Sequence, residues 1–258
     1  MRKRKWDGTS VGFTIFWMVS AVILLYRLDF DLRVWLAGGT ITVRSGNPYE
    51  YDYLLHFPKG YHDFGGKRPL IIFLHGAGET GKDVNILRTL DIFHYAKGKI
   101  DEKDFPFIVV SPMTPKHGWE PRRLIHFLDE LLADKRFRYR IDQNRIYLTG
   151  FSMGGFGTFR TACEFPDRFA AIVPLAGGCE PDDAAKLQTV PTWAFHGDAD
   201  DAVPYDQSKN MVSAMEDLKH PNVRLTTLHG AGHGIPDMVY TRPELYRWML
   251  EQKTEPWR

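Results

Sequence analysis

Six short apolar runs, separated by longer stretches with helical periodicity, limit what this chain can fold into more than any other feature. The runs cover residues 69–75, 105–112, 145–151, 169–177, 191–197 and 223–230. Runs that are apolar at nearly every position fit strands buried on both faces, as in a parallel sheet covered by helices on both sides. Between two of them, one leucine-rich helical face is formed by Leu124, Leu128, Leu131 and Leu132. The alternation predicts a doubly wound, mostly parallel α/β sheet.

The remaining segments complete this prediction. Residues 40–44 suggest a short strand, and the alternating, aromatic-rich residues 49–58 suit an antiparallel edge strand. Two further helices are expected at 206–219 and 242–252.

The glycine-rich segment Leu148–Gly157 follows one of the runs and surrounds a single serine, Ser152, with four glycines. A P-loop would need Lys and then Ser or Thr after its last glycine, so a phosphate cradle is excluded. The pentapeptide "GFSMG" instead matches Gly-x-Ser-x-Gly, a strand-to-helix turn that holds a nucleophilic serine in a strained conformation. Gly150 and Gly154 are small where strand and helix nearly touch. The pattern predicts Ser152 as a nucleophile.

Histidines and acids follow other runs, where sites of doubly wound sheets form. A serine hydroxyl needs a neighbouring base, and we predict His233, in a glycine-flanked loop, over His229, which ends the last run itself. His75 and His196 each precede a glycine at a strand end and are expected to shape loops by hydrogen bonding. An acid must orient the base, and spacing does not decide among the three aspartates that follow 191–197, which are Asp198, Asp200 and Asp201.

Acyl transfer also needs backbone N–H donors where negative charge develops on the substrate oxygen. We predict the N–H of Met153, directly after the serine, and the N–H of Ala77 in "HGAG". Trp119 and Phe151 are candidate walls of a substrate pocket, although aromatic residues in such places are at least as often core.

These motifs resemble the α/β-hydrolase superfamily, and within it the lidless serine esterases grouped with feruloyl esterases, polyhydroxybutyrate-depolymerase-like proteins and "predicted peptidases". The resemblance runs from about Tyr49 to Leu250 and rests on "PLIIFLHGAGETG", the segment 140–178 around "GFSMG", and "HGDADDAVP". The last resembles His-Gly-x-x-Asp-x-x-Val-Pro, which implies that Asp200 is the acid. Only "GCEPDDAAKLQTV" stands where lipases insert a lid. We therefore expect an open site suited to short acyl esters or esters displayed on a polymer.

The sequence thus predicts a serine hydrolase that cleaves carboxylic esters through an acyl-enzyme on Ser152, with His233 as base and Asp200 as orienting acid. A peptidase or amidase with the same triad is the alternative, and a non-catalytic binding protein on this fold is a third. The expected partner is a small-molecule or polymer-borne ester, without cofactor or metal. The net charge of +1 gives no indication of nucleic-acid binding, and nothing indicates an oligomeric state.

A hydrophobic segment, Gly8–Tyr26, precedes the predicted domain and holds 19 residues without a charge behind the basic start "MRKRK". This length can span a bilayer as a helix, and no small-x-small cleavage site follows closely. We predict a membrane anchor at 1–26, a connector at 27–48 and an extracytoplasmic catalytic domain at 49–258. A cleaved secretion signal and a packed N-terminal helix are alternatives.

Two cysteines, Cys163 and Cys179, could pair in an oxidising compartment. The predicted fold places them at opposite ends of the sheet layer, so we expect both to be free.

Overall fold

The computed structural model describes residues 39–45, 50–58, 66–101, 104–134 and 139–254. The chain divides into two units, Met1–Ile41 and Thr42–Arg258. The predicted hydrophobic helix and most of the predicted connector lie outside the described residues. Within the described ranges, no helix combines the length and hydropathy needed to cross a membrane.

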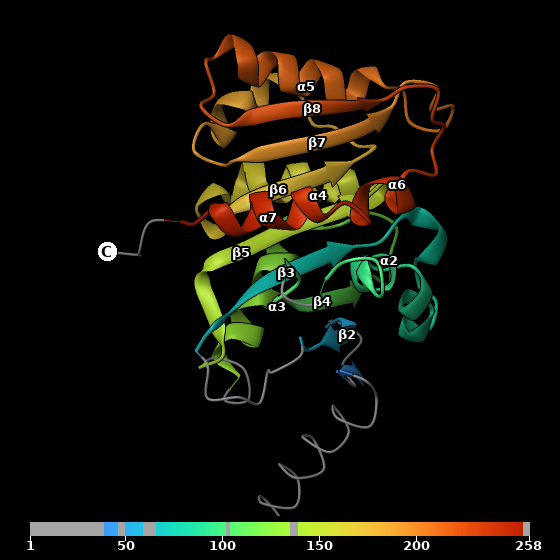
Figure 1. The fold of residues 1–258 in the computed structure, drawn as a ribbon, viewed down its shortest axis with the longest axis vertical. Helices are drawn as coiled ribbons and strands as arrows, with labels where there is room; N and C mark the ends of the chain where they lie inside the picture. The colour runs from blue at the N-terminus through green and yellow to red at the C-terminus, as the bar shows by residue number, and fades with distance from the viewer. Residues whose placement is uncertain (1–38, 46–49, 59–65, 102–103, 135–138, 255–258) are drawn as a thin grey trace, which may run out of the picture. The chain divides into compact units, whose positions relative to one another are not determined.

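The described residues form an eight-stranded sheet in the order β1-β2-β4-β3-β5-β6-β7-β8. Strands β3 to β8 run parallel to one another, and β2 runs antiparallel to β4 (Figure 1). The strands are β1 (Thr40–Val43), β2 (Asp52–His56), β3 (Arg68–Leu74), β4 (Ile108–Met113), β5 (Ile141–Phe151), β6 (Ala171–Leu175), β7 (Thr192–Gly197) and β8 (Val223–Leu228). The six apolar runs are therefore the six parallel strands, and the predicted mostly parallel sheet is confirmed.

One detail of the sheet differs from the prediction. Residues 49–58 contain the antiparallel strand β2, as expected, but β2 is not the edge strand. The short strand predicted at 40–44 is β1, and it occupies the edge beyond β2.

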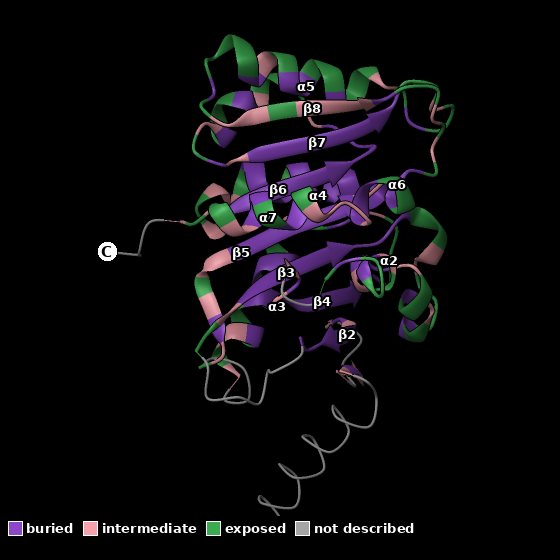
Figure 2. Ribbon diagram, viewed as in Figure 1, coloured by how far each residue is buried: buried purple, intermediate pink, exposed green. Residues whose placement is uncertain are grey.

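Burial explains why the strand sequences are continuously apolar and not alternating. Every residue of β4, β6 and β7 is buried, and so is every residue of β3 after Arg68. Strand β8 lies at the other edge and is mostly half-buried. Figure 2 shows this change from a buried centre to a less buried edge strand. Helices on both faces exclude water from the central strands, so both faces need apolar side chains.

Those helices lie in two layers, one on each face of the sheet (Figure 1). One layer holds α3 (Pro121–Ala133), α4 (Met153–Glu164) and α5 (Asp206–Asp217), and the other holds α2 (Ile92–Ala96), α6 (Pro236–Tyr240) and α7 (Pro243–Glu251). The loops contain the 3-10 helices η1 (Ala77–Glu79), η2 (Val84–Thr89), η4 (Pro166–Arg168) and η5 (Pro181–Leu187). Both helices predicted after the fifth run, α5 and α7, are present. On α3, Leu124, Leu128 and Leu131 are buried as predicted, whereas Leu132 is half-buried.

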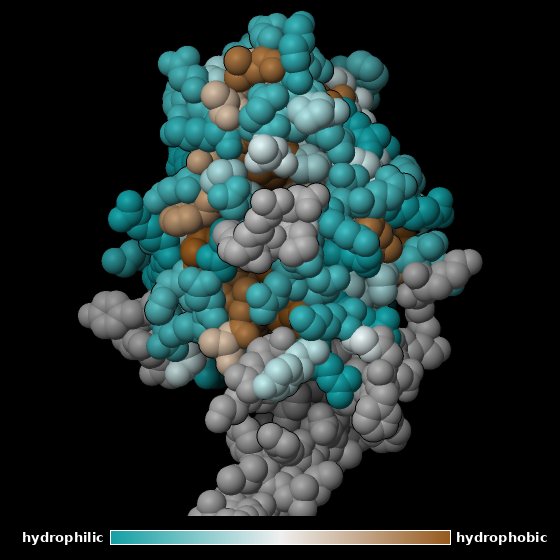
Figure 3. Space-filling model, turned by 90° about the vertical axis from the view of Figure 1, so that its left-hand side faces the viewer, coloured by the Kyte–Doolittle hydropathy of each residue, from teal (hydrophilic) through white to brown (hydrophobic). Residues whose placement is uncertain are grey.

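The carboxyl ends of the parallel strands all lie on one side of the molecule, so the loops that follow the strands meet there. The opposite side, where these strands begin, faces the viewer in Figure 3. Its surface is mostly hydrophilic, with hydrophobic residues in small separate groups. A cavity of about 540 Å³ lies near the start of β5, away from Ser152 at its end. It is lined by Asp129, Leu132, Ala133, Gln143, Ile146 and Arg168.

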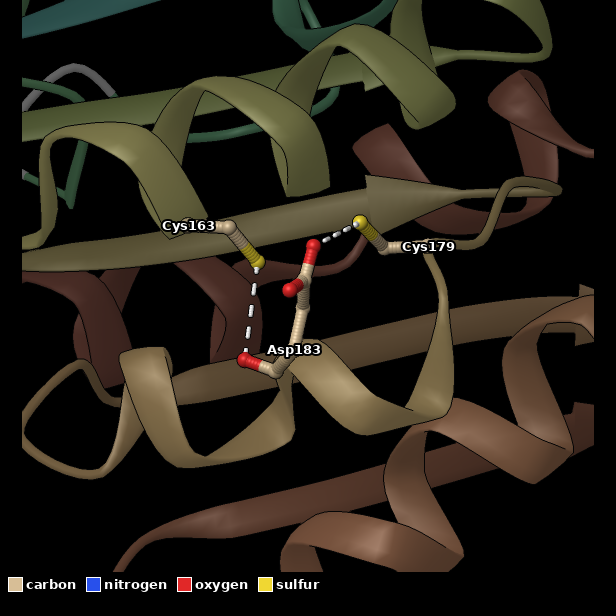
Figure 4. A group of neighbouring side chains, drawn as sticks. All are labelled: Cys163, Cys179 and Asp183. Carbon is tan, nitrogen blue, oxygen red and sulfur yellow. Dashed lines mark hydrogen bonds between the residues drawn. The ribbon is translucent and has the colours of Figure 1, made fainter.

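The predicted separation of the two cysteines is wrong. Cys163 lies in the last turn of α4 and Cys179 in the loop after β6, and both thiols approach Asp183 in η5 (Figure 4). They meet because the chain turns back after β6 and η5 packs along α4. Both cysteines are free, as expected.

Candidate active site

Ser152 lies between β5 and α4 in a backbone conformation that few non-glycine residues adopt, with φ 57° and ψ −117°. Its N–H donates to the carbonyl of Leu175 on β6 at 2.9 Å, and its own carbonyl accepts the N–H of Phe156 at 3.0 Å. These bonds hold the strained turn in place. The serine therefore stands at the carboxyl end of a central strand, as the pentapeptide predicted.

The glycines around Ser152 allow strand and helix to approach more closely than any side chain would permit. A Cβ on Gly150 would lie 2.6 Å from the carbonyl oxygen of Gly154 and 2.7 Å from that of Leu74. A Cβ on Gly154 would overlap the Leu74 carbonyl, and one on Gly155 would overlap that of Leu175. Any of these side chains would push α4 away from the sheet.

Three loops bring the predicted serine, histidine and acid into one hydrogen-bonded line. His233 Nε2 lies 2.9 Å from Ser152 Oγ, and His233 Nδ1 lies 2.8 Å from Asp200 Oδ2. Ser152 follows β5, His233 follows β8 and Asp200 follows β7. The carboxyl ends of these parallel strands lie on the same side of the sheet. With Nδ1–H donating to the carboxylate, Nε2 is left to accept a proton from the serine hydroxyl. This arrangement can activate a serine, and the catalytic roles themselves remain predictions.

Asp200 has a side chain with 0% exposure, and hydrogen bonds compensate for this burial. Its Oδ1 accepts the N–H groups of Ala202 and Val203, each at 2.9 Å. Burial alone would raise the pKa of this carboxyl, but the hydrogen bonds from His233, Val203 and Ala202 outweigh it and lower the pKa below its ordinary value. Asp200 is therefore a carboxylate at neutral pH, as an orienting acid must be.

The two other aspartates of this loop lie elsewhere. Asp198 pairs with His229, with 2.8 Å between Oδ2 and Nδ1, and accepts the N–H of Gly230 at 2.7 Å. The side chain of His229 is 85% exposed. Asp201 is also exposed. The structure thus brings Asp200 to His233 and holds the rival pair, Asp198 and His229, apart from it.

His75 fixes the backbone of the loop after β3, as predicted. Its Nδ1 donates to the carbonyl of Gly76 at 2.6 Å, and its Nε2 accepts the N–H of Thr114 at 3.1 Å. Burial lowers the pKa of His75 to about 4. A neutral imidazole satisfies both contacts, so His75 is a structural residue.

His196 shapes the loop after β7, but it also has a contact that sequence reasoning missed. Its Nδ1 lies 2.7 Å from Ser208 Oγ and its Nε2 lies 3.0 Å from the carbonyl of Val203, as a loop-shaping role requires. Nε2 also lies 3.3 Å from Asp200 Oδ2, the oxygen that contacts His233. The spacing of four residues between His196 and Asp200 is the signal that could have indicated this second histidine.

The two predicted oxyanion donors lie at element starts beyond strand ends. Ala77 is exposed and begins η1, and Met153 begins α4. In the described part of the chain, neither N–H donates to a protein acceptor. The Met153 side chain has a contact that the sequence did not indicate, since its Sδ lies 3.1 Å from the backbone nitrogen of Gly118. Free N–H groups at a helix start suit a developing oxyanion.

The two candidate pocket walls have different surroundings. Phe151 is half-buried, and its ring lies 4.7 Å from that of His233. Trp119 is 4% exposed and packs against Gly157, and its Nε1 donates to the carbonyl of His75 at 3.1 Å. Phe151 therefore borders the site, whereas Trp119 packs between α4 and the loop after β3 with little of its ring exposed.

Comparison with known proteins gives the following similarities. The phospholipase/carboxylesterase family matches residues 122–240. A protein described as "Probable feruloyl esterase C" from Aspergillus terreus is 25% identical over 176 residues, covering 67% of this chain and 64% of the relative. Poly(3-hydroxyalkanoate) depolymerase C from Paucimonas lemoignei is 28% identical over 142 residues, covering 51% of this chain and 32% of the relative. A solved structure of a thermostable esterase superposes with a TM-score of 0.71 at 28% identity, covering 84% of this chain and 64% of that chain.

The strand order, the turn at Ser152 and these similarities show that the chain has an α/β-hydrolase fold and is similar to esterases. This confirms the resemblance seen in the motifs. The chain spans about two thirds of the length of the feruloyl esterase relative and about a third of the depolymerase relative.

Proposed function

We propose that this α/β-hydrolase cleaves carboxylic esters through an acyl-enzyme on Ser152. The observation that carries the proposal is the continuous hydrogen-bonded line from buried Asp200 through His233 to the Ser152 hydroxyl. Esterases and depolymerases among the similar proteins support the reaction class.

The chemistry follows from this geometry. As Ser152 Oγ attacks the ester carbonyl carbon, His233 Nε2 takes the hydroxyl proton and Asp200 stabilises the resulting imidazolium. The substrate oxygen gains negative charge and accepts the N–H groups of Met153 and Ala77. His233 then gives its proton to the leaving alcohol. A water molecule, deprotonated by His233, releases the acid from the serine in the same manner.

An open site favours short acyl esters or esters displayed on a polymer. Between β6 and β7 the chain has only one 3-10 helix, η5, where a lid domain would otherwise cover the serine. Because Ser152 and His233 are only partly buried, a bulky alcohol component can extend into solvent. The two named relatives, a feruloyl esterase and a polyhydroxyalkanoate depolymerase, support this substrate class.

Ser152→Ala tests the proposal directly. We expect the variant to lose kcat/KM for p-nitrophenyl butyrate by at least about 10³-fold, because the nucleophile is removed. Ser213→Ala, on the exposed face of α5, is the matched control and should retain wild-type activity. Near wild-type hydrolysis by Ser152→Ala would contradict the proposal, and absence of hydrolysis in the wild type would favour a binding protein.

Peptide or amide hydrolysis is the second candidate, because the same three side chains can cleave amides. Comparing wild-type kcat/KM for matched acyl esters and acyl amides distinguishes the two. We expect the ester to be preferred, and comparable values would favour the peptidase.

The N-terminal segment adds a proposal about location. Gly8–Tyr26 acts as an uncleaved anchor that displays the catalytic unit outside the cytoplasm, supported by its 19 uncharged residues and the preceding basic residues. Cell fractionation should place the full-length chain in the membrane, with Ser152 activity sensitive to protease added outside the cell. Full-length protein in the soluble fraction would contradict the anchor.

A further inference from the structure

A group of reactive side chains lies outside the candidate active site, between α4 and η5. The Sγ atoms of Cys163 and Cys179 and a carboxylate oxygen of Asp183 all lie within 4.8 Å of one another (Figure 4). The two sulfurs approach from different elements, the last turn of α4 and the loop after β6. Nothing in the ester-cleaving site uses them, so the group needs its own explanation.

Each protonated thiol has an acceptor on the same residue. Cys163 Sγ lies 4.0 Å from the carbonyl of Asp183, and Cys179 Sγ lies 3.8 Å from Asp183 Oδ2. The interaction of the two sulfurs in the singly deprotonated pair raises the pKa of Cys163, which burial raises further, and lowers the pKa of Cys179. Cys179 is therefore the first to become a thiolate, and the thiolate is the nucleophilic form.

Solvent exposure also favours Cys179 over Cys163 as the first cysteine to react. Cys163 is buried with 6% exposure, whereas Cys179 is half-buried and can be reached from solvent. An accessible thiolate beside a buried thiol is the arrangement in which one cysteine reacts first and the other completes a disulfide.

Two sulfurs and a carboxylate could also hold a metal ion, but the nearby charges oppose one. Lys186 Nζ lies 2.6 Å from Asp183 Oδ1, so this carboxylate already has a cationic partner. The positive charge of Arg160 favours the Cys179 thiolate, although the negative charge of Asp183 opposes it more strongly. A divalent cation would have to enter against both positive charges, whereas an uncharged disulfide would not.

We propose that Cys163 and Cys179 are a thiol pair that small-molecule disulfides oxidise to an intramolecular bridge. The Cys179 thiolate attacks one sulfur of a disulfide such as oxidised glutathione, and one glutathione thiolate leaves. Cys163 then loses its proton to solvent and attacks Cys179 Sγ, which expels the second glutathione thiolate. The protein loses two hydrogens in total, and the small disulfide is reduced to two thiols.

The bridge would link two segments that pack beside Ser152, the helix α4 and the loop after β6. It joins the end of α4 to a loop that begins at Ala176, which has φ 47°, and Gly177, whose added Cβ would overlap Gly155. Because the bridge closes a short loop in the unfolded chain, it stabilises the folded unit against unfolding. We expect oxidation to raise the Tm by about 5–10 °C.

Equilibration of the folded, full-length protein with oxidised and reduced glutathione tests the proposal. Intact-mass and peptide analysis should find a Cys163–Cys179 bridge and no lasting glutathione adduct in the wild type. Cys163→Ser should stop at one glutathione adduct on Cys179, and Cys179→Ser should react more than tenfold slower. The Tm rise should appear in the wild type alone.

Three results would overturn the proposal. The first is that both thiols stay free in excess oxidised glutathione. The second is a wild type that ends as a stable mixed disulfide. The third is stoichiometric zinc in the purified wild type that is lost in Cys179→Ser, which would make the group a metal site. None of these readouts depends on ester hydrolysis, so failure of the proposed esterase function would leave this test intact.

Discussion

At the scale of single residues, the site depends on one loop offering two carboxylates for two different histidines. Asp200 is buried and contacts His233, whereas Asp198 contacts the exposed His229. Asp198 and Asp200 are two residues apart, so their distances along the sequence from Ser152 are nearly the same. The two aspartate side chains point in different directions from the loop after β7 and so reach different histidines. No simple sequence pattern predicts these directions.

Neutralising these acids should therefore have unequal effects. Asp200→Asn should lower kcat by about 10⁴-fold, because the amide no longer stabilises the imidazolium or selects the required tautomer of His233. Asp198→Asn is the matched control and should stay within about threefold of the wild type, since its partner is exposed and does not contact Ser152. Steady-state kinetics with a p-nitrophenyl ester measures both. Equal losses in the two variants would contradict the assignment.

At the scale of elements, β5 and α4 act as one unit because backbone touches backbone between them. Gly154→Ala should destabilise the protein by at least about 3 kcal/mol, since its Cβ would overlap the Leu74 carbonyl and the helix must shift. Gly234→Ala, where no atom lies within 4 Å of the added Cβ, should change stability by less than about 0.5 kcal/mol. Urea unfolding midpoints measure the difference. A small effect at Gly154 would contradict the close approach.

The start of α2 predicts a pH dependence of stability. Asp91 caps this helix by accepting the N–H of His94, and burial raises the pKa of its carboxyl to about 6. The folded protein therefore holds this proton more tightly than the unfolded chain does. The resulting stability is present below about pH 4 and is lost as pH rises through about 6, a decrease on the order of 2–3 kcal/mol.

Asp91→Asn should remove this decrease, because an uncharged amide keeps the helix cap without ionising. The free energy of unfolding of the variant should fall less than that of the wild type between pH 4 and pH 7. Denaturant unfolding at several pH values measures both curves. Parallel curves for the two proteins would show that Asp91 does not titrate in this range.

At the scale of the whole molecule, the sequence predicted what depends on burial and chain order. Continuous apolar runs marked the central strands because both faces of β4, β6 and β7 are covered by helices. Ser152, Asp200 and His233 each follow a different parallel strand, and this position predicted that the three side chains lie close together. Contacts between segments that fold back on one another were not predictable, as the neighbouring Cys163 and Cys179 illustrate.

The central claim is that Ser152 is a nucleophile activated by the line through His233 to Asp200, and covalent labelling tests it most directly. The folded protein is treated with a fluorophosphonate, and the labelled peptide is identified by mass spectrometry. We expect one label per chain, on Ser152, and no label in Ser152→Ala or after unfolding. A folded wild-type protein that stays unlabelled, or that carries the label on another residue, would contradict the claim.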